Sequence, residues 1–203
     1  MADQEKVSTE KKKIAILGWG SLIWDAKANR AFDRLHGEWM WHGPVLKLEF
    51  SRKSKTSRAG ALTLVIDPKH GAPCTVVYAL STRSGPAEAI EDLRRREGTS
   101  AENIGRFLAD ESQPDPGQND AALGTISAWA EEKRLDVVLW TALGGDFDAV
   151  FEKDFVRAAV KYVQELKAEG KAKAAEYVWR APEFVRTPLR EALQKEPWFE
   201  PPK

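Results

Sequence analysis

Apolar residues concentrate in short segments along the first 80 positions, and Gly, Pro or charged residues separate these segments. Segments of this length, rich in Val, Ile, Leu and Thr, are typical of β-strands. The pattern therefore predicts four strands in this half of the chain, at residues 14–17, 45–51, 60–67 and 73–80. The basic residues just after the second segment, which include Arg52 and Arg58, are expected on a hairpin loop.

The spacing of apolar residues changes after position 85 and predicts mainly helices. A helix over 86–97 is favoured because Pro86 stands at its first position and Gly98 just past its end. Apolar residues three and four positions apart predict another helix over 147–169, which Gly170 would end. The remaining predicted elements are helices over 121–133 and 188–194, a buried strand over 135–143 and a surface loop over 110–120.

Strands in the first half and helices in the second favour an α+β fold over a doubly wound sheet. We expect a mixed sheet, curved or closed into a barrel, with helices at its flanks. The length of 203 residues suits one domain. We therefore predict a single domain over residues 13–203 with a helical C-terminal half, preceded by a disordered arm at 1–12.

The composition of the chain argues against several classes of function. The chain has 31 basic and 31 acidic residues, so zero net charge argues against nucleic acid or an anionic membrane as the main partner. The single Cys74 suits a reducing compartment, and three histidines without ligand-like spacing argue against a zinc site. The first 13 residues contain no apolar segment, and no apolar run approaches the ~20 residues that span a bilayer. We expect a cytoplasmic protein without a metal or another cofactor.

The candidate chemistry begins in a turn that follows the first strand, Gly18-Trp19-Gly20-Ser21-Leu22, named here the 18–22 turn. Its two glycines allow a positive φ or a very close approach to a bound group, and its successive N–H groups could bind an anion. Familiar glycine motifs do not fit. A dinucleotide-binding GxGxxG and a nucleophile elbow GxSxG would both require Gly at Ile23, and no lysine completes a phosphate-binding loop.

The 18–22 turn resembles the signature of the γ-glutamylcyclotransferase superfamily, Tyr-Gly-Ser followed by Leu, Asn or a near relative. The ChaC-type branch commonly continues with an apolar residue and Trp, as Ile23 and Trp24 do here. This chain departs from the pattern at Trp19, where the family usually has Tyr. The resemblance implies a γ-glutamylcyclotransferase-like fold and a small-molecule γ-glutamyl substrate.

A second signal is the carboxylate at the end of the 86–97 helix. Helical spacing puts Ile90, Leu93 and Glu97 on one stripe, so Glu97 shares a face with apolar residues. It also lies beside the negative end of the helix dipole. Burial and the dipole both disfavour the anion and predict a raised pKa. The alternative is that Glu97 pairs with Arg94 or Arg96 at a solvated helix end.

The resemblance favours the first interpretation, because ChaC-type enzymes carry a leucine-containing helix that ends in Arg-Glu, and that Glu is catalytic. Here Glu97 ends the run Leu93-Arg94-Arg95-Arg96-Glu97, 76 residues after Ser21 and beyond β-rich sequence, as in the family. The match covers residues 14–97. It implies that Glu97 is the general acid/base, and that Gly18, Trp19, Gly20, Ser21 and Leu22 bind substrate.

The family reaction is an intramolecular cyclisation of a γ-glutamyl compound to 5-oxoproline, which releases an amine or amino acid. A substrate carboxylate could also pair with Arg52, although a solvated hairpin charge explains that residue as well. Two other functions stay open. One is a non-catalytic small-molecule binding or interaction domain on the same scaffold; the other, disfavoured by the charge balance, is nucleic-acid binding through residues 52–58.

Overall fold

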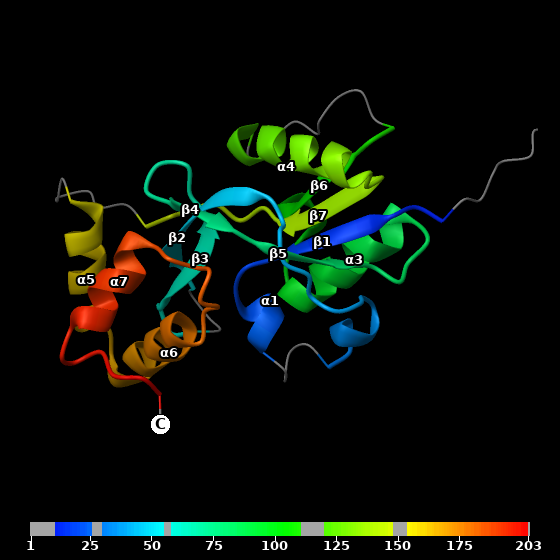
Figure 1. The fold of residues 1–203 in the computed structure, drawn as a ribbon. Helices are drawn as coiled ribbons and strands as arrows, with labels where there is room; N and C mark the ends of the chain where they lie inside the picture. The colour runs from blue at the N-terminus through cyan, green and yellow to red at the C-terminus, as the bar shows by residue number, and fades with distance from the viewer. Residues whose placement is uncertain (1–10, 26–29, 55–57, 111–119, 148–153, 203) are drawn as a thin grey trace, which may run out of the picture.

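The computed structural model describes residues 11–25, 30–54, 58–110, 120–147 and 154–202. These residues form a mixed α+β structure with two sheets (Figure 1). The first sheet has the order β5-β1-β7-β6 and consists of β1 (Ile14–Gly18), β5 (Val77–Leu80), β6 (Ile104–Leu108) and β7 (Val137–Thr141). In it β1 and β7 run parallel, whereas the β1–β5 and β6–β7 pairs are antiparallel.

Helices cover both faces of this first sheet. Helix α3 (Pro86–Glu97) lies on one side and α4 (Asp120–Lys133) on the other (Figure 1). Alternate residues of β1 and β7 therefore enter different apolar clusters, which explains why both strands are continuously apolar. The α3 side receives Ile14, Ile16, Val137 and Leu139, and the α4 side receives Ala15, Leu17, Val138 and Trp140.

The second sheet is antiparallel, with the order β3-β2-β4. Its strands are β2 (Val45–Lys53), β3 (Leu62–Ile66) and β4 (Ala72–Thr75). Three helices pack at this end of the molecule, away from α3: α5 (Phe155–Glu165), α6 (Ala168–Trp179) and α7 (Pro188–Lys195) (Figure 1). Short helical segments complete the described chain: α1 (Ser21–Trp24) and the 3-10 turns η1 (Phe32–Arg34) and η2 (Ala101–Asn103).

The arrangement of the strands differs from the predicted single curved or barrel-like sheet. Within the described residues, two sheets form and neither closes into a barrel. The predicted strand over 73–80 is divided, with β4 in one sheet and β5 in the other. The division falls at Val76, whose N–H donates to Pro44 O and whose carbonyl accepts from Gly43 N, so this residue bonds a loop instead of a strand.

The predicted helix over 147–169 also differs. Two helices, α5 and α6, form instead, because Leu166 and Lys167 adopt extended backbone conformations between them. Gly170 lies inside α6 and does not end a helix. A Cβ at this position would come within 2.6 Å of Ala59 O, so the glycine allows α6 to pack closely against the chain at Ala59.

Other predicted elements correspond closely to the structure. Strands β1, β2, β3 and β7, the helix over 86–97 and helices α4 and α7 all form near their predicted bounds. Strand β6 and the short helix α1 were not predicted, and β6 and β7 carry strand structure into the second half of the chain. Residues 1–10 of the predicted arm, most of the predicted loop (111–119) and the start of the predicted long helix (148–153) lie outside the described residues.

The packing of the first sheet can be tested by a substitution at Gly105. This residue lies opposite Trp140 across the β6–β7 pair, and a Cβ there would overlap the buried indole ring. We expect Gly105→Ala to lower the free energy of unfolding by about 1–3 kcal/mol, as overpacking of cores does. Urea denaturation measures this change. The control is Gly124→Ala on α4, where a Cβ meets nothing within 4 Å; equal stability of the two variants would contradict the packing described.

Candidate functional site

One cavity brings the 18–22 turn and Glu97 together. It has a volume of about 60 Å³ and lies where the ends of β1, β7 and α3 meet helix α6. The residues that line it are Leu17, Trp19, Gly20, Ser21, Leu22, Leu64, Val65, Glu97, Thr141, Leu143 and Tyr177. Among these, Glu97 has the carboxylate, so this cavity combines an acid/base group with a glycine turn in an otherwise mainly apolar wall.

The glycines of the 18–22 turn are explained by close packing. A Cβ on Gly18 would lie 2.7 Å from the Trp39 ring, and one on Gly20 would lie 2.7 Å from the Tyr177 hydroxyl. Gly20 has a negative φ of −128°, so left-handed backbone is not the reason for this residue. Trp19 is buried with 6% of its surface exposed and lines the cavity. Gly18 ends β1, where it pairs with Val77, and does not line the cavity.

Glu97 is the last residue of α3, and Gly98 follows just past its end, as predicted, in a left-handed conformation. The Glu97 side chain is 18% exposed, and Leu93 of the same helix is fully buried. Burial raises the pKa of the Glu97 carboxyl, while the positive charges of Arg96 and Arg58 and a hydrogen bond from Thr141 oppose that rise. The alternative interpretation is therefore correct in part: Glu97 lies 3.4 Å from Arg96, but this helix end is largely buried and the carboxylate does not extend into solvent.

Tyr177 and Arg58 belong to this site but were not identified from the sequence. The hydroxyl of Tyr177 hydrogen-bonds both the backbone N–H and the side chain of Ser21. The Arg58 guanidinium lies 4.4 Å from the centre of the Tyr177 ring. In the sequence Tyr177 is one more apolar-face residue of a helix, and Arg58 is one charge in a basic loop, so neither has a local signature.

Two expectations about substrate-binding groups change in the structure. The Ser21 amide is not used by sheet or helix, but it already donates to the Tyr177 hydroxyl, so a ligand carboxylate at the turn would have to replace that hydroxyl. Arg52 does not line the cavity. Its Nη1 donates to Gly144 O at 3.0 Å, which is a structural contact between β2 and the chain after β7.

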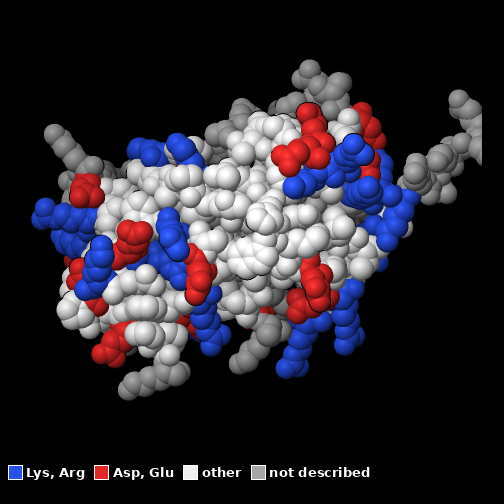
Figure 2. Space-filling view, viewed as in Figure 1, with Lys and Arg blue, Asp and Glu red and all other residues white. Residues whose placement is uncertain are grey.

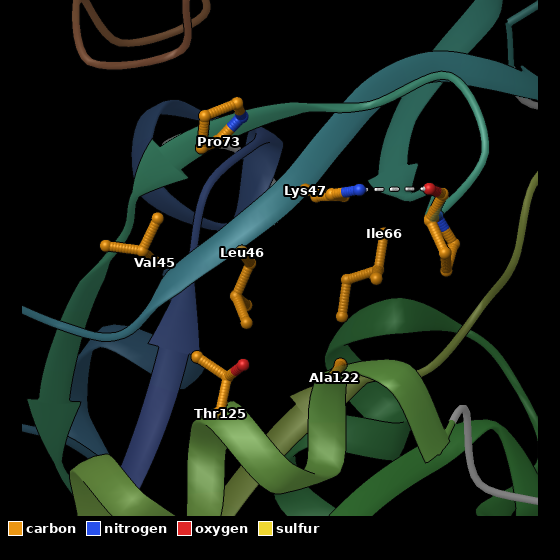
Figure 3. Close-up of a pocket in the computed structure, with 8 residues that line it drawn as sticks. Val45, Leu46, Lys47, Ile66, Pro73, Ala122 and Thr125 are labelled. Atoms are coloured by element: carbon orange, nitrogen blue, oxygen red, sulfur yellow. Dashed lines mark hydrogen bonds between the residues drawn. The ribbon is translucent and has the colours of Figure 1, made fainter.

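Two other cavities are larger but provide weaker support for a catalytic site. A groove of about 340 Å³ lies between α4 and the second sheet. Leu46, Ile66 and Ala122 contribute apolar side chains to it (Figure 3). Its one ionisable lining residue, Lys47, lies 3.5 Å from Pro68 O. The groove is larger than the cavity at Glu97, but among the described residues that line it no carboxylate or imidazole is present.

A third cavity, of about 610 Å³, contains Asp67 and His70. His70 Nδ1 lies 3.2 Å from Asp67 Oδ2, and the other carboxylate oxygen accepts from the N–H groups of Lys69 and His70. Burial alone would raise the pKa of Asp67, but hydrogen bonds from His70 and Lys69, together with the nearby Ser51 hydroxyl, outweigh burial and lower it. These contacts stabilise the turn at 67–70 and explain both residues without a ligand.

The described residues contain no group of three or more His, Cys, Asp or Glu side chains that could hold a metal ion. No helix within them is long and apolar enough to cross a membrane. Figure 2 shows blue and red side chains intermixed at both ends of one face, with a largely uncharged region between them. No continuous basic surface is visible on that face.

No protein-family model matches the sequence, and no curated protein matches it.

Proposed function

We propose that this protein is a γ-glutamylcyclotransferase-like enzyme that converts a γ-glutamyl compound to 5-oxoproline and releases an amine or amino acid. The observation that carries the proposal is the shared cavity of Glu97 and the 18–22 turn. These are the two elements of the family resemblance, and Glu97 follows Ser21 by 76 positions in the chain.

The reaction requires a base for the attacking nitrogen and an acid for the leaving nitrogen, and one carboxylate can act as both in turn. Glu97 takes a proton from the substrate α-ammonium, and the free amine then attacks the γ-carbonyl carbon. The new C–N bond closes the five-membered ring, and the bond to the leaving nitrogen breaks when Glu97 returns the proton to it. The ring nitrogen releases its second proton to solvent and becomes the neutral lactam N–H, and the released amine takes up a proton from solvent and becomes an ammonium. A raised pKa suits this sequence because the carboxyl must accept and then donate near neutral pH. Attack within one molecule also removes the entropic cost of bringing two reactants together.

Hydrogen-bond donors near Glu97 can stabilise the negative charge that develops on the γ-carbonyl oxygen. The candidates are the amide and hydroxyl of Ser21 and the hydroxyl of Tyr177, which lie together at the turn. The cavity, at about 60 Å³, is smaller than the ~150 Å³ cavity that holds benzene in an engineered protein core. A glutamyl group therefore requires a side chain to move, and Tyr177, which lines the cavity and contacts the turn at Gly20, is the candidate.

The proposed function is tested by incubation of the purified protein with a panel of γ-glutamyl amino acids, peptides and amines, and by measurement of 5-oxoproline by mass spectrometry. We expect at least one compound to yield 5-oxoproline together with a stoichiometric amount of the released amine. A control without protein accounts for spontaneous cyclisation. A panel without turnover would contradict the proposal.

The second candidate is a small-molecule binding domain without catalysis. Two observations favour it: Trp19 stands where the family usually has Tyr, and the Tyr177 hydroxyl already bonds the Ser21 amide. Isothermal titration calorimetry with the same compounds distinguishes the two candidates. Binding of a γ-glutamyl compound without release of 5-oxoproline would favour the binding domain.

A further inference from the structure

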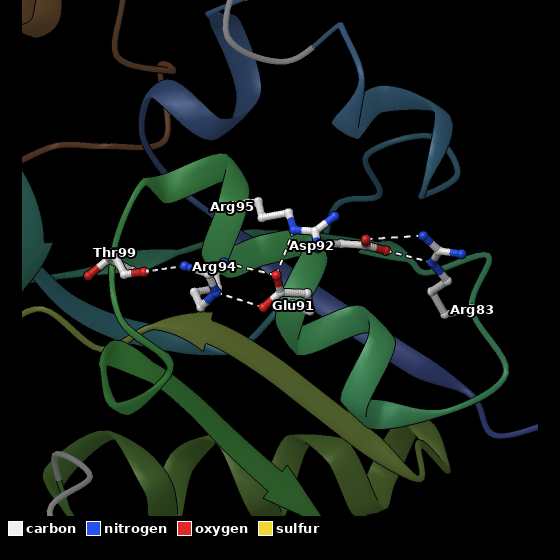
Figure 4. A network of polar contacts seen from close by, with 6 residues as sticks. All are labelled: Arg83, Glu91, Asp92, Arg94, Arg95 and Thr99. Carbon is white, nitrogen blue, oxygen red and sulfur yellow. Dashed lines mark hydrogen bonds and ion pairs between the residues drawn. The ribbon is translucent and has the colours of Figure 1, made fainter.

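Arg96 differs from the two arginines that precede it in α3. Arg94 and Arg95 are 34% and 70% exposed, and both bond Glu91 on the outside of the helix (Figure 4). The Arg96 side chain is only 7% exposed and turns toward the 18–22 turn. Buried guanidinium groups are uncommon unless they are paired, so the contacts of Arg96 indicate its purpose.

The guanidinium of Arg96 connects the two parts of the candidate site. Its Nη2 donates to Ser21 O at 2.8 Å, and its Nη1 lies 3.4 Å from Glu97 Oε1. A planar guanidinium can direct N–H groups to two acceptors at once, which the single ammonium of lysine does less well. Arg96 therefore fixes the distance between the carboxylate and the backbone of the 18–22 turn.

We propose that Arg96 is a positioning residue that holds the Glu97 carboxylate against the 18–22 turn and favours its ionised form. The proposal rests on the proposed function for its catalytic consequence, but the control of the carboxylate by Arg96 is independent of any substrate. Without Arg96, a buried carboxylate beside an apolar wall would retain its proton to higher pH and would be a poorer base.

Other groups near Glu97 set the background for this effect. Within the described residues, Arg58 from the β2–β3 connection also acts on the Glu97 carboxylate, and Tyr177 of α6 interacts with both. Thr141 of β7 contributes a neutral hydrogen bond. Burial raises the pKa of Glu97, and among the groups that oppose this rise Arg96 has the largest effect. Arg96 also contacts the turn directly, through Ser21 O.

The test compares Arg96→Met with Arg95→Met, which removes the same charge from an exposed position one residue away. The pKa of Glu97 is measured by NMR with ¹³C-labelled glutamate, and a Glu97→Gln sample assigns the resonance. We expect Arg96→Met to raise this pKa by at least about one unit, because an opposite charge at such short range lowers a carboxyl pKa by 1–3 units. Arg95→Met should leave it nearly unchanged, since exposed charges are screened. Equal pKa values in the wild type and Arg96→Met would overturn the proposal.

The pH profile of kcat/KM for 5-oxoproline release gives the second readout. In Arg96→Met the acid limb of the profile should move to higher pH, with at least a tenfold loss at pH 7. If the wild type releases no 5-oxoproline, the proposed function fails, and the Glu97 titration still decides whether Arg96 controls the carboxylate.

Loss of one member of a buried ion pair can prevent folding, so Arg96→Lys provides a second variant. It retains the charge but cannot direct the same paired N–H groups. We expect its acid limb close to that of the wild type, with kcat lowered several-fold. A lower melting temperature with unchanged kcat and pH profile would show a merely structural role and would refute positioning.

Discussion

Glu97→Gln is expected to lower 5-oxoproline formation by at least ~10²-fold while the protein remains folded. Glutamine has nearly the shape of glutamate and can still accept a hydrogen bond from Thr141, but it cannot take a proton from the substrate ammonium. The measurement is kcat/KM with the best compound from the substrate panel, together with circular dichroism. Glu88→Gln, at an exposed position in the first turn of α3, is the matched control.

The pH dependence of the wild type follows from the same residue. Because burial raises the pKa of Glu97, the carboxylate becomes protonated as the pH falls through a value above the usual 4.5. Activity should therefore decline on the acid side of neutrality. Glu97→Asp should also lose most activity, because the shorter side chain withdraws the carboxylate from its position. Equal turnover by Glu97→Gln and the wild type would show that the assigned mechanism is wrong.

Glu49→Gln is expected to remove much of the pH dependence of stability between pH 5 and 8. Glu49 lies in the middle of β2 and is completely buried. Its carboxylate accepts hydrogen bonds from Thr187 Oγ1 at 2.6 Å, Phe50 N at 2.8 Å and Leu189 N at 3.2 Å, which connect β2 to the start of α7. Burial nevertheless raises the pKa of Glu49 from 4.5 to about 7, with these hydrogen bonds opposing the rise and the negative charge of Asp67 adding to it.

The sign of the effect follows from proton linkage. A folded-state pKa above the unfolded value means that the folded protein holds a proton which the unfolded chain releases between pH 4.5 and 7. The resulting stability is fully present below pH 4.5 and is lost as the pH rises to 7, and the loss is about 3 kcal/mol. Glutamine does not titrate, so the variant lacks this contribution.

Urea denaturation at several values between pH 5 and 8 measures the difference between the wild type and Glu49→Gln. The slope of unfolding free energy against pH, not the absolute stability, is the informative quantity, because the glutamine amide cannot accept from Leu189 N. Glu191→Gln, an exposed position on α7, is the control and should keep the wild-type slope. Parallel curves for the wild type and Glu49→Gln would show that Glu49 does not titrate in this range.

Local signals predicted the parts of the fold that depend on neighbouring residues. The bounds of α3 follow from Pro86 and Gly98, because the fixed φ of proline and the left-handed conformation of glycine act within one helical turn. The division of 73–80 depends on the contacts of Val76 with Gly43 and Pro44, which are more than 30 residues earlier. No pattern within 73–80 reports those contacts, so the sequence favoured one strand.

In the candidate site, too, features set by neighbouring residues could be predicted and contacts between distant residues could not. Glu97 could be proposed from the helix that carries it, because the apolar stripe and the helix end are both local features. Tyr177 and Arg58 reach the turn from α6 and from the β2–β3 connection, so only the folded chain brings them there. Arg52 has a suitable charge and an unsuitable location, since β2 directs it to Gly144 instead of the cavity.

The parallel pairing of β1 with β7 has a consequence for folding during synthesis. One edge of β1 pairs with β5 and the other with β7, where Ile14 lies opposite Val137. Strands β1 and β5 can therefore associate first. The other edge of β1 stays unpaired until β7 is made, more than a hundred residues after β1. An apolar strand with an unpaired edge can associate with other chains in that interval. Thr141 and Tyr177 are made later still. On the ribosome, the carboxylate and the turn therefore emerge well before the segments that enclose them.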